Sequence, residues 1–75
     1  MSLDKLDVGK VGRIRAIFCK GIKRKRFLDF GFIKGAMVAV VRRSPSGSPT
    51  AYYINGTTIA IRDEDAKTIF VNPEI

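Results

Sequence analysis

Alternation of apolar and polar residues predicts several short β-strands in this chain. In the segment 13–18, Ile14, Ala16 and Phe18 are expected to share one face of a strand. The segment 37–41 is apolar and rich in Val without a break, which predicts a central strand buried on both sides. A last short strand, 69–71, is expected to stop at Asn72-Pro73.

The clearest local feature is a β-hairpin. Two strand-like runs, 51–54 and 57–61, are separated only by Asn55-Gly56. Asn-Gly accepts the positive φ angles of a type I′ turn, whose twist matches two antiparallel strands.

Two segments have helical character, and one is plainly a loop. The segment 22–30 has neither Gly nor Pro and ends before Gly31, which predicts a short helix, although its apolar residues do not form one stripe. The segment 63–67 predicts a single helical turn that Asp63 caps, with acidic residues at the positive end of the turn. Pro, Ser and Gly make 44–49 a loop between strands.

These elements favour a mainly β fold, a small SH3-like barrel of about five strands. One short helix follows the first strand and a helical turn precedes the last. Closure of the barrel is expected to hide sheet edges that 75 residues have no other means to cover. At this length, residues 1–75 are expected to form a single domain.

Aromatic residues are expected to complete the thin core of the barrel. The helix and its exit are predicted to plug one open end through Phe27, Phe30, Phe32 and Ile33, and loss of Phe30 is expected to unfold the domain. Because side chains alternate along a strand, one member of the Tyr52-Tyr53 pair is expected inside and the other in solvent. By analogy with SH3 domains, an exposed Tyr beside the loop 45–49 would form a peptide-binding groove; the alternative is that this segment is merely a loop.

The charge is strongly positive and uneven. The formal net charge is +7, and residues 1–43 carry twelve Lys and Arg against three Asp. An excess of this size suggests an acidic partner, either a nucleic acid, an anionic membrane surface or an acidic protein face. The densest cluster lies within 20–26 and consists of Lys20, Lys23, Arg24, Lys25 and Arg26.

This cluster has a functional and a structural interpretation. It is either a docking patch for an acidic partner or phosphates, or a solvated helix face in which Asp29 offsets Lys25 or Arg26. No aromatic residue is interleaved with it as a base-stacking platform requires.

The chain offers little for catalysis or metal binding. There is no His, and the single cysteine, Cys19, is more typical of a core or edge residue than of a ligand. Asp63, Glu64 and Asp65 supply carboxylates alone, which suits a helix start better than a transition-metal site. We therefore expect a non-enzyme with no cofactor and no assigned metal site, weak adventitious binding of a transition metal staying open. Without a membrane span or signal segment, it is expected in the cytoplasm.

Four blocks of sequence then resemble a known family. They are 6–9 with its Leu-x-x-Gly, 26–35 with its Arg-x-x-x-x-Gly and closing Gly, the loop 43–49, and 59–71 with its Ala-Ile-Arg and Ile-x-Val. In this order and spacing they are similar to the FeoA family of small proteins associated with bacterial ferrous iron uptake. Lys34 stands where the family has Pro, Phe27 where it has Leu, and Ser46 and Ser48 where its loop has Leu and Asp.

The resemblance implies a function. A FeoA-like protein would be an accessory of ferrous iron transport, acting by contact with the cytoplasmic region of the membrane transporter FeoB, without a small-molecule substrate and as a monomer or weak homo-oligomer. We expect that contact to use the basic cluster together with Pro45, Gly47 and Pro49. The alternatives are a nucleic-acid-binding SH3-like module, whose binding would fall steeply with salt, and a detached C-terminal domain of an iron-dependent repressor.

Overall fold

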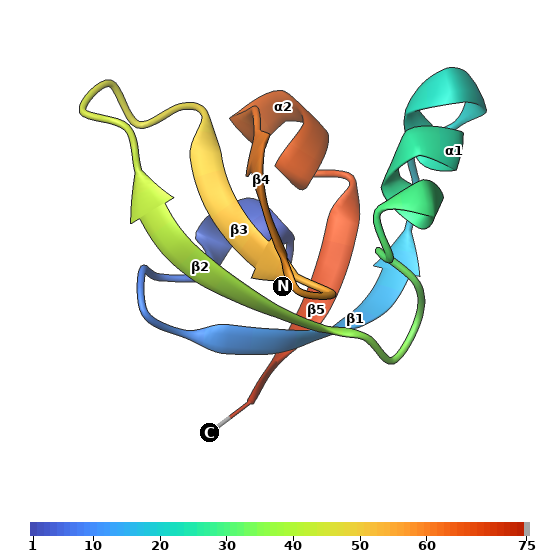
Figure 1. Cartoon of the computed structure of the whole chain (residues 1–75), viewed down its shortest axis with the longest axis horizontal. Helices are drawn as coiled ribbons and strands as arrows, with labels where there is room; N and C mark the ends of the chain where they lie inside the picture. Colours follow the sequence, from blue (N-terminus) through green and yellow to red (C-terminus); the bar gives the residue numbers. More distant parts are fainter. Residues whose placement is uncertain (75) are drawn as a thin grey trace.

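The strands pair in the order β4-β3-β2-β1-β5, all antiparallel, in one strongly curled sheet (Figure 1). The computed structural model describes residues 1–74. Its elements are η1 (Leu3–Lys5), β1 (Val11–Ile17), α1 (Gly21–Asp29), β2 (Met37–Arg43), β3 (Thr50–Ile54), β4 (Thr57–Ile61), α2 (Asp63–Ala66) and β5 (Ile69–Glu74). The predicted five strands, the helix after the first strand and the helical turn before the last are confirmed.

The barrel is not closed by strand pairing, contrary to the expectation from sequence. Within residues 1–74, β4 and β5 are the two ends of the sheet and do not pair with each other. The outer side of β5 is covered instead by the start of the chain, where the Val71 N–H donates to the Met1 carbonyl at 2.8 Å and Ser2 bridges Phe70. Among residues 1–74, no strand lies beside the corresponding side of β4.

One face of the curled sheet forms the core. Inward side chains from all five strands meet side chains of η1, α1 and α2 there. The buried apolar residues are Leu3, Leu6, Ile14, Phe27, Phe32, Val38, Val40, Tyr52, Ile54, Ile61, Ala66, Ile69 and Val71. In β2 only Val38 and Val40 point inward, while Met37 and Val41 are 41% and 47% exposed. The prediction that this strand is buried on both sides is wrong, because a curled single sheet has one interior and its outer face meets solvent.

A β-bulge changes the inward set of β1. Ile14 pairs with Val71 and Ala16 with Phe70, so Arg15 is an extra residue in β1. The bulge shifts the alternation by one position, so that Ile17 packs against the core and Phe18 is 63% exposed. The prediction that Phe18 shares one face of the strand with Ile14 is therefore wrong. The Phe18 ring instead meets Phe70 edge to face, with centroids 5.4 Å apart.

The last strand is longer than the sequence predicts. β5 continues through Asn72-Pro73 to Glu74, and Pro73 lies opposite Gly12 of β1. Proline lacks the N–H that a central strand must donate, but an end strand such as β5 needs donors on one side only. Proline therefore does not stop this strand.

The predicted hairpin is confirmed. β3 and β4 pair from Thr50–Ile61 to Ile54–Thr57, and the two turn residues have positive φ, 51° at Asn55 and 78° at Gly56. These are the angles that a type I′ turn requires.

The helix exit directs only part of the predicted plug inward. Gly31, with a φ of 100°, ends α1, and the Phe32 N–H donates to the Phe27 carbonyl at 2.9 Å in a Schellman arrangement. This reversal of the chain brings the rings of Phe27 and Phe32 within 5.6 Å of each other inside the barrel. Phe30 and Ile33 are left 40% and 52% exposed. They do not plug the barrel.

Arg43 ties the first residues of the chain to the sheet, a role that sequence reasoning missed. A second bulge, at Val41, turns Arg43 inward toward the buried Thr50, whose hydroxyl oxygen accepts from Nη1 at 3.1 Å. Nη2 donates to the carbonyl oxygens of Leu6 at 2.6 Å and Asp4 at 3.2 Å. Arg43 thus holds η1, which contributes buried Leu3, over one end of the barrel.

Replacing Arg43 with alanine is expected to destabilise the fold by about 2 kcal/mol, because hydrogen bonds from a charged donor contribute about 1.5–3 kcal/mol. Urea unfolding followed by circular dichroism measures the change. Arg42→Ala is the matched control, because Arg42 is exposed and its replacement removes the same charge. Equal midpoints for the two variants would contradict the role of Arg43.

Candidate partner-binding surface

The basic helix α1 is attached to the barrel at few points. Phe27 is its one buried side chain among the described residues. Two hydrogen bonds add to the packing of Phe27. Arg24 Nη1 donates to the Ile17 carbonyl at 2.8 Å, and Lys23 Nζ donates to Asp65 Oδ1 of α2 at 2.9 Å. Ile22, at 78% exposed, projects into solvent. The helix therefore stands out from the barrel (Figure 1).

The cations at the start of α1 do not stabilise the helix. The first turn of α1 has no acidic residue, and Lys20 at the N-cap makes no side-chain cap. Positive charges at the positive end of a helix are unfavourable. Within residues 1–74, no ion pair joins Asp29 to Lys25 or Arg26, so the expected offset does not form. Arg26 lies in the last turn, where a cation is favourable, but helix stability does not explain the cluster as a whole.

The five cations of the cluster divide into two groups. Lys23 and Arg24 are engaged inside the molecule, as described above. Lys20, Lys25 and Arg26 are exposed, and among the described residues their side chains make no hydrogen bond or ion pair. These three are available to a partner.

The bond between Lys23 and Asp65 persists over the ordinary pH range. Asp65 raises the pKa of Lys23 above its usual 10.5, first through the hydrogen bond and then through its charge. A lysine whose pKa is higher in the folded state than in the unfolded state stabilises the fold at every pH below its unfolded-state pKa. That stabilisation is lost as the pH rises through the folded-state pKa. The link between α1 and α2 is therefore complete at neutral pH.

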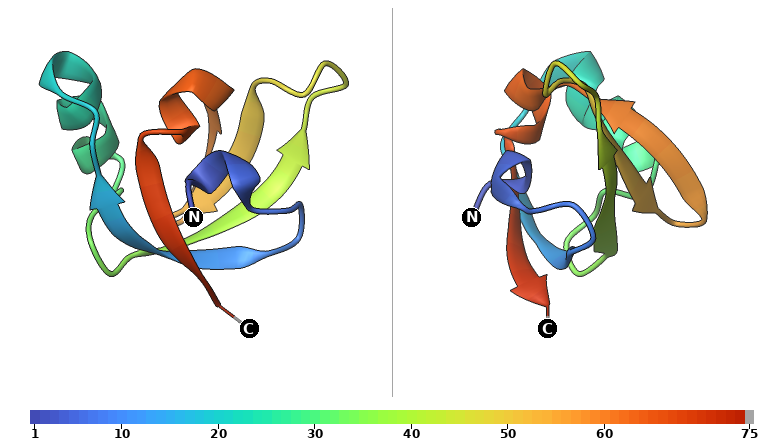
Figure 2. Two further views of the ribbon diagram at one scale, coloured as in Figure 1. Left: turned by 180° about the vertical axis from the view of Figure 1, so that it is seen from behind. Right: turned by 90° about the vertical axis from the view of Figure 1, so that its left-hand side faces the viewer.

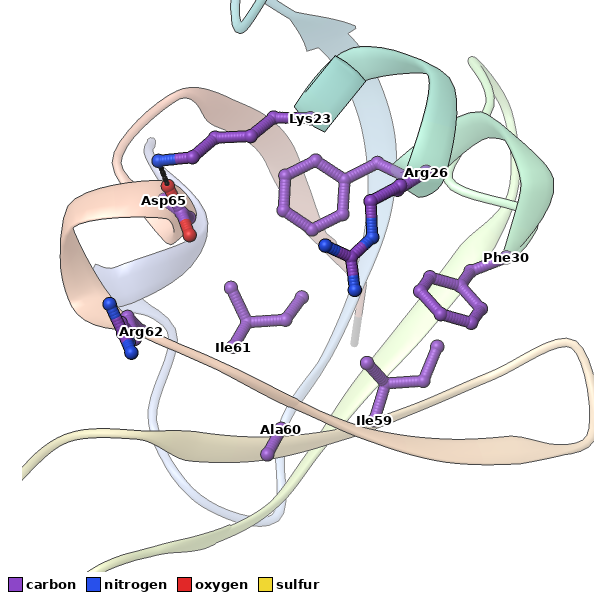
Figure 3. Close-up of a pocket in the computed structure, with 9 residues that line it drawn as sticks. Lys23, Arg26, Phe30, Ile59, Ala60, Ile61, Arg62 and Asp65 are labelled. Atoms are coloured by element: carbon purple, nitrogen blue, oxygen red, sulfur yellow. Dashed lines mark hydrogen bonds and ion pairs between the residues drawn. The ribbon is translucent and has the colours of Figure 1, made fainter.

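A groove runs between α1, β4 and α2 (Figure 3). Its volume is about 360 Å³, and apolar and charged side chains both line it. The lining residues are Lys23, Arg26, Phe27, Phe30, Ile59, Ala60, Ile61, Arg62 and Asp65. In Figure 3 the guanidinium group of Arg26 points into the groove, between Ile61 and Phe30. Sequence reasoning did not find this groove, because it forms only when three separate elements come together.

The 44–49 loop is held by its own serines. The Ser46 hydroxyl donates to the Ser48 carbonyl at 3.0 Å, and the Gly47 N–H donates to the Ser44 carbonyl at 2.8 Å. Pro45 and Pro49 are exposed and Gly47 is half-buried.

Ser48 also explains how α2 begins. Its hydroxyl oxygen accepts the Asp63 N–H at 3.1 Å. The N-cap position belongs to Arg62, and Asp63 is the first helical residue, so the predicted capping by Asp63 is wrong. The hydrogen-bond acceptor at the start of α2 is therefore the hydroxyl of Ser48, from a loop distant in sequence. The sequence suggested instead that a residue of the helical turn itself supplies this acceptor.

The structure separates the two parts of the predicted docking face. The loop 44–49 lies at the far side of the molecule from α1, with α2 between them, in both Figure 1 and the reverse view of Figure 2. Lys20 and Lys25 therefore do not share one patch with Pro45 and Pro49.

The remaining candidate residues occupy ordinary positions. Tyr52 is fully buried and Tyr53 is 50% exposed, as the alternation predicts, and burial raises the pKa of the Tyr52 hydroxyl. Neither Tyr53 nor the loop lines the groove described above. Cys19 packs against the edge of the core, as expected.

Two of the three acidic residues of α2 are used in contacts with cations. Asp65 bonds to Lys23, and Glu64 lies 3.9 Å from Arg62.

Across residues 1–74, no helix is long and apolar enough to cross a membrane.

Comparison with protein families and relatives gives a consistent result. The profile of the FeoA domain matches residues 1–73. A relative from Porphyromonas gingivalis, a fusion of Fe(2+) transport protein A with the Fe(2+) transporter FeoB, is 35% identical over 71 residues, which is 95% of this chain. The chain spans only 8% of that fusion protein.

Solved structures agree with the fold. FeoA from Chlorobium tepidum superposes with a TM-score of 0.92 at 29% identity, over 97% of this chain and 70% of that one. FeoA from Stenotrophomonas maltophilia, solved with zinc and described as a prokaryotic SH3 domain protein, gives a TM-score of 0.86 at 25% identity, over 96% and 89% of the two chains. The predicted SH3-like architecture is confirmed.

Proposed function

This chain belongs to the FeoA family of ferrous iron transport, and we propose that it is a cytoplasmic, non-enzymatic accessory protein that binds the cytoplasmic region of an FeoB-type transporter. The observation that carries the proposal is the fusion relative, which joins a domain like this one to FeoB in one polypeptide. A fused arrangement keeps the two parts together at fixed stoichiometry and high effective concentration.

The basic helix supplies a surface for such contact. Lys20, Lys25 and Arg26 are free of internal partners in the part of the chain that the structure describes. Lys20, at the N-cap, lies at the positive end of α1, where a cation lowers helix stability, a cost that binding an acidic surface would offset. We assign the main contact to α1. The loop with Pro45, Gly47 and Pro49 then contacts the partner only if the partner reaches around α2.

The proposal assigns no metal to this chain. Regulation of the transporter then follows from the protein contact itself and not from delivery of iron. Iron remains the cargo of the transporter.

Calorimetry tests the contact directly. The purified chain is titrated with the cytoplasmic region of the FeoB-type transporter of the same organism. The double variant Lys20→Glu/Lys25→Glu is expected to weaken binding at least about tenfold, because the reversed charges repel the acidic surface that they otherwise attract. Higher salt should weaken the wild-type contact as well.

The matched control is Lys5→Glu/Lys10→Glu, which makes the same change in net charge at exposed positions away from α1. It is expected to bind nearly as the wild type does. Equal loss in both double variants would assign the contact to overall charge and overturn the role of α1. Absence of binding by the wild type, together with normal ferrous uptake in a deletion strain, would refute the proposed function.

A further inference from the structure

The edge of β4 is an unusual feature of this sheet. In a two-residue hairpin the residues beside the turn exchange main-chain hydrogen bonds, and bonded pairs recur at every second position. The pairs Ile54–Thr57, Tyr52–Ile59 and Thr50–Ile61 are then the bonded ones. The N–H and C=O groups of Thr58 and Ala60 consequently turn away from β3.

This edge carries none of the usual protection. Proteins guard exposed edges with lysine, proline, a bulge or a covering segment. β4 reads Thr-Thr-Ile-Ala-Ile, with no charge and no proline, and its pairing with β3 is regular. The opposite edge of the sheet, on β5, is covered by Met1 and Ser2. Within residues 1–74, β4 alone offers a free and regular strand edge.

The groove beside this edge has a defined chemistry. Ile61 is buried and Ile59 half-buried on its strand side, and Phe30 is 40% exposed on its helix side. Three cations line the groove against one carboxylate, and Lys23 already binds that carboxylate, Asp65. Arg26 extends over the apolar residues without a partner of its own among the described residues (Figure 3).

We infer that the groove binds an extended acidic segment of the partner protein, which adds as a strand to the free edge of β4. Its main chain bonds to Thr58 and Ala60, a carboxylate bonds to the guanidinium of Arg26, and an apolar side chain packs against Phe30 and Ile59. Strand addition of this kind draws affinity from main-chain hydrogen bonds and specificity from the pockets for alternate side chains. An apolar residue and an acidic residue two positions apart lie on one face of a strand, about 7 Å apart.

The inference rests on the proposed function in taking the partner to be the transporter's cytoplasmic region. The two are tested separately by using two binding partners. One is that cytoplasmic region, and the other is the synthetic peptide acetyl-Val-Thr-Glu-Thr-Val-Thr-Glu-amide, which places Val and Glu on one face. Failure of the cytoplasmic region alone to bind counts against the proposed function, while the peptide still tests the groove.

Amide hydrogen exchange measured by NMR reports strand addition directly. With either partner bound, exchange at Thr58 and Ala60 is expected to slow at least about tenfold, because their N–H groups become hydrogen-bonded. Peptides N-methylated on the edge-facing amides are expected to bind about tenfold more weakly, since they lose main-chain donors. Binding without protection of Thr58 and Ala60, or with protection centred on Ser44–Pro49, overturns the inference.

Arg26→Ala tests the charged contact. It is expected to weaken peptide binding about tenfold, since charge-assisted hydrogen bonds are among the stronger polar contacts. Lys34→Ala is the matched control, because Lys34 is exposed and lies outside the groove. The same peptide with Lys in place of Glu is expected not to bind.

Three results would assign the groove to another occupant and overturn the inference. The first is equal binding of the Lys-containing and Glu-containing peptides. The second is Arg26-dependent binding to phosphatidylglycerol vesicles with no effect of Arg26→Ala on the peptide. The third is concentration-dependent dimerisation that protects Thr58 and Ala60 without any partner, which would identify a second copy of the chain.

Discussion

Replacing Phe32 by alanine is expected to remove most of the stability of the fold at 25 °C. Phe32 is fully buried, and its ring packs on Phe27 with centroids 5.6 Å apart. Truncation of a buried phenylalanine to alanine costs about 3–5 kcal/mol, the loss of burial together with the cavity that remains. Small domains are stable by about 5 kcal/mol. The variant therefore loses most of its stability, which urea titration and near-ultraviolet circular dichroism measure.

Phe30→Ala is the informative comparison for Phe32→Ala. Phe30 is 40% exposed, so its truncation should cost no more than about 1 kcal/mol and leave a cooperative transition. The sequence pattern singles out Phe30 as the essential ring, and the structure assigns that place to Phe32. Comparable losses in the two variants would show that Phe30 contributes to the core.

Gly31→Ala is expected to destabilise the protein by about 3 kcal/mol, through two separate effects. The backbone at Gly31 has a φ of 100°, which disfavours any residue with a Cβ atom. The new Cβ would also lie 3.1 Å from the Cβ of Asn55, in the β3–β4 turn. The first effect costs about 1–2 kcal/mol, and crowding of this kind adds a similar amount. Urea unfolding measures the total.

Two further variants separate these effects. Gly35→Ala is destabilised by the unfavourable φ angle alone, because Gly35 has a φ of 93° and no atom lies within 4 Å of the added Cβ. It should cost about half as much as Gly31→Ala. Asn55→Gly removes the crowded atom and suits a type I′ turn, so in combination it should restore part of the loss in Gly31→Ala. An equal cost for Gly31→Ala and Gly35→Ala would show that the contact with Asn55 is unimportant.

Several local signals in the sequence predicted local structure correctly, whereas the predicted strand stop at Asn72-Pro73 and the predicted cap at Asp63 failed. Asn55-Gly56 specifies its turn through the φ angles of two adjacent residues, and Gly31 ends α1 for the same kind of reason. The alternation of Tyr52 and Tyr53 likewise needs only the geometry of one strand. Each of these features depends on residues that are neighbours in the chain.

Features that depend on distant residues escaped prediction. The bulges at Arg15 and Val41 each reverse the alternation of a strand, and a single extra residue leaves no mark in a short apolar pattern. The first bulge moves Phe18 outward, and the second turns Arg43 inward. Side-chain type alone suggested the opposite position in both cases, because Phe is usually buried and Arg usually exposed.

The candidate site shows the same division. The run of cations along 20–26 is visible in the sequence, but its division into tied and free side chains depends on Ile17 and Asp65, which the fold brings to α1. The groove requires α1, β4 and α2 together. The density of positive charge can be read from the sequence. The groove into which Arg26 points cannot, because three elements distant in sequence form it.

The pairing of β1 with both β2 and β5 has a consequence for the order of folding. β2, β3 and β4 follow one another and can form a meander from contacts close in sequence. β1 gains its second neighbour only when Ile69–Glu74 is in place, and the same strand then anchors Met1 and Ser2. On a ribosome, the β2–β4 meander can form while β1 still lacks that neighbour, and closing such distant pairs is slow. The last strand of this sheet therefore completes the structure, and until it arrives the apolar inner face of β1 stays exposed to other chains.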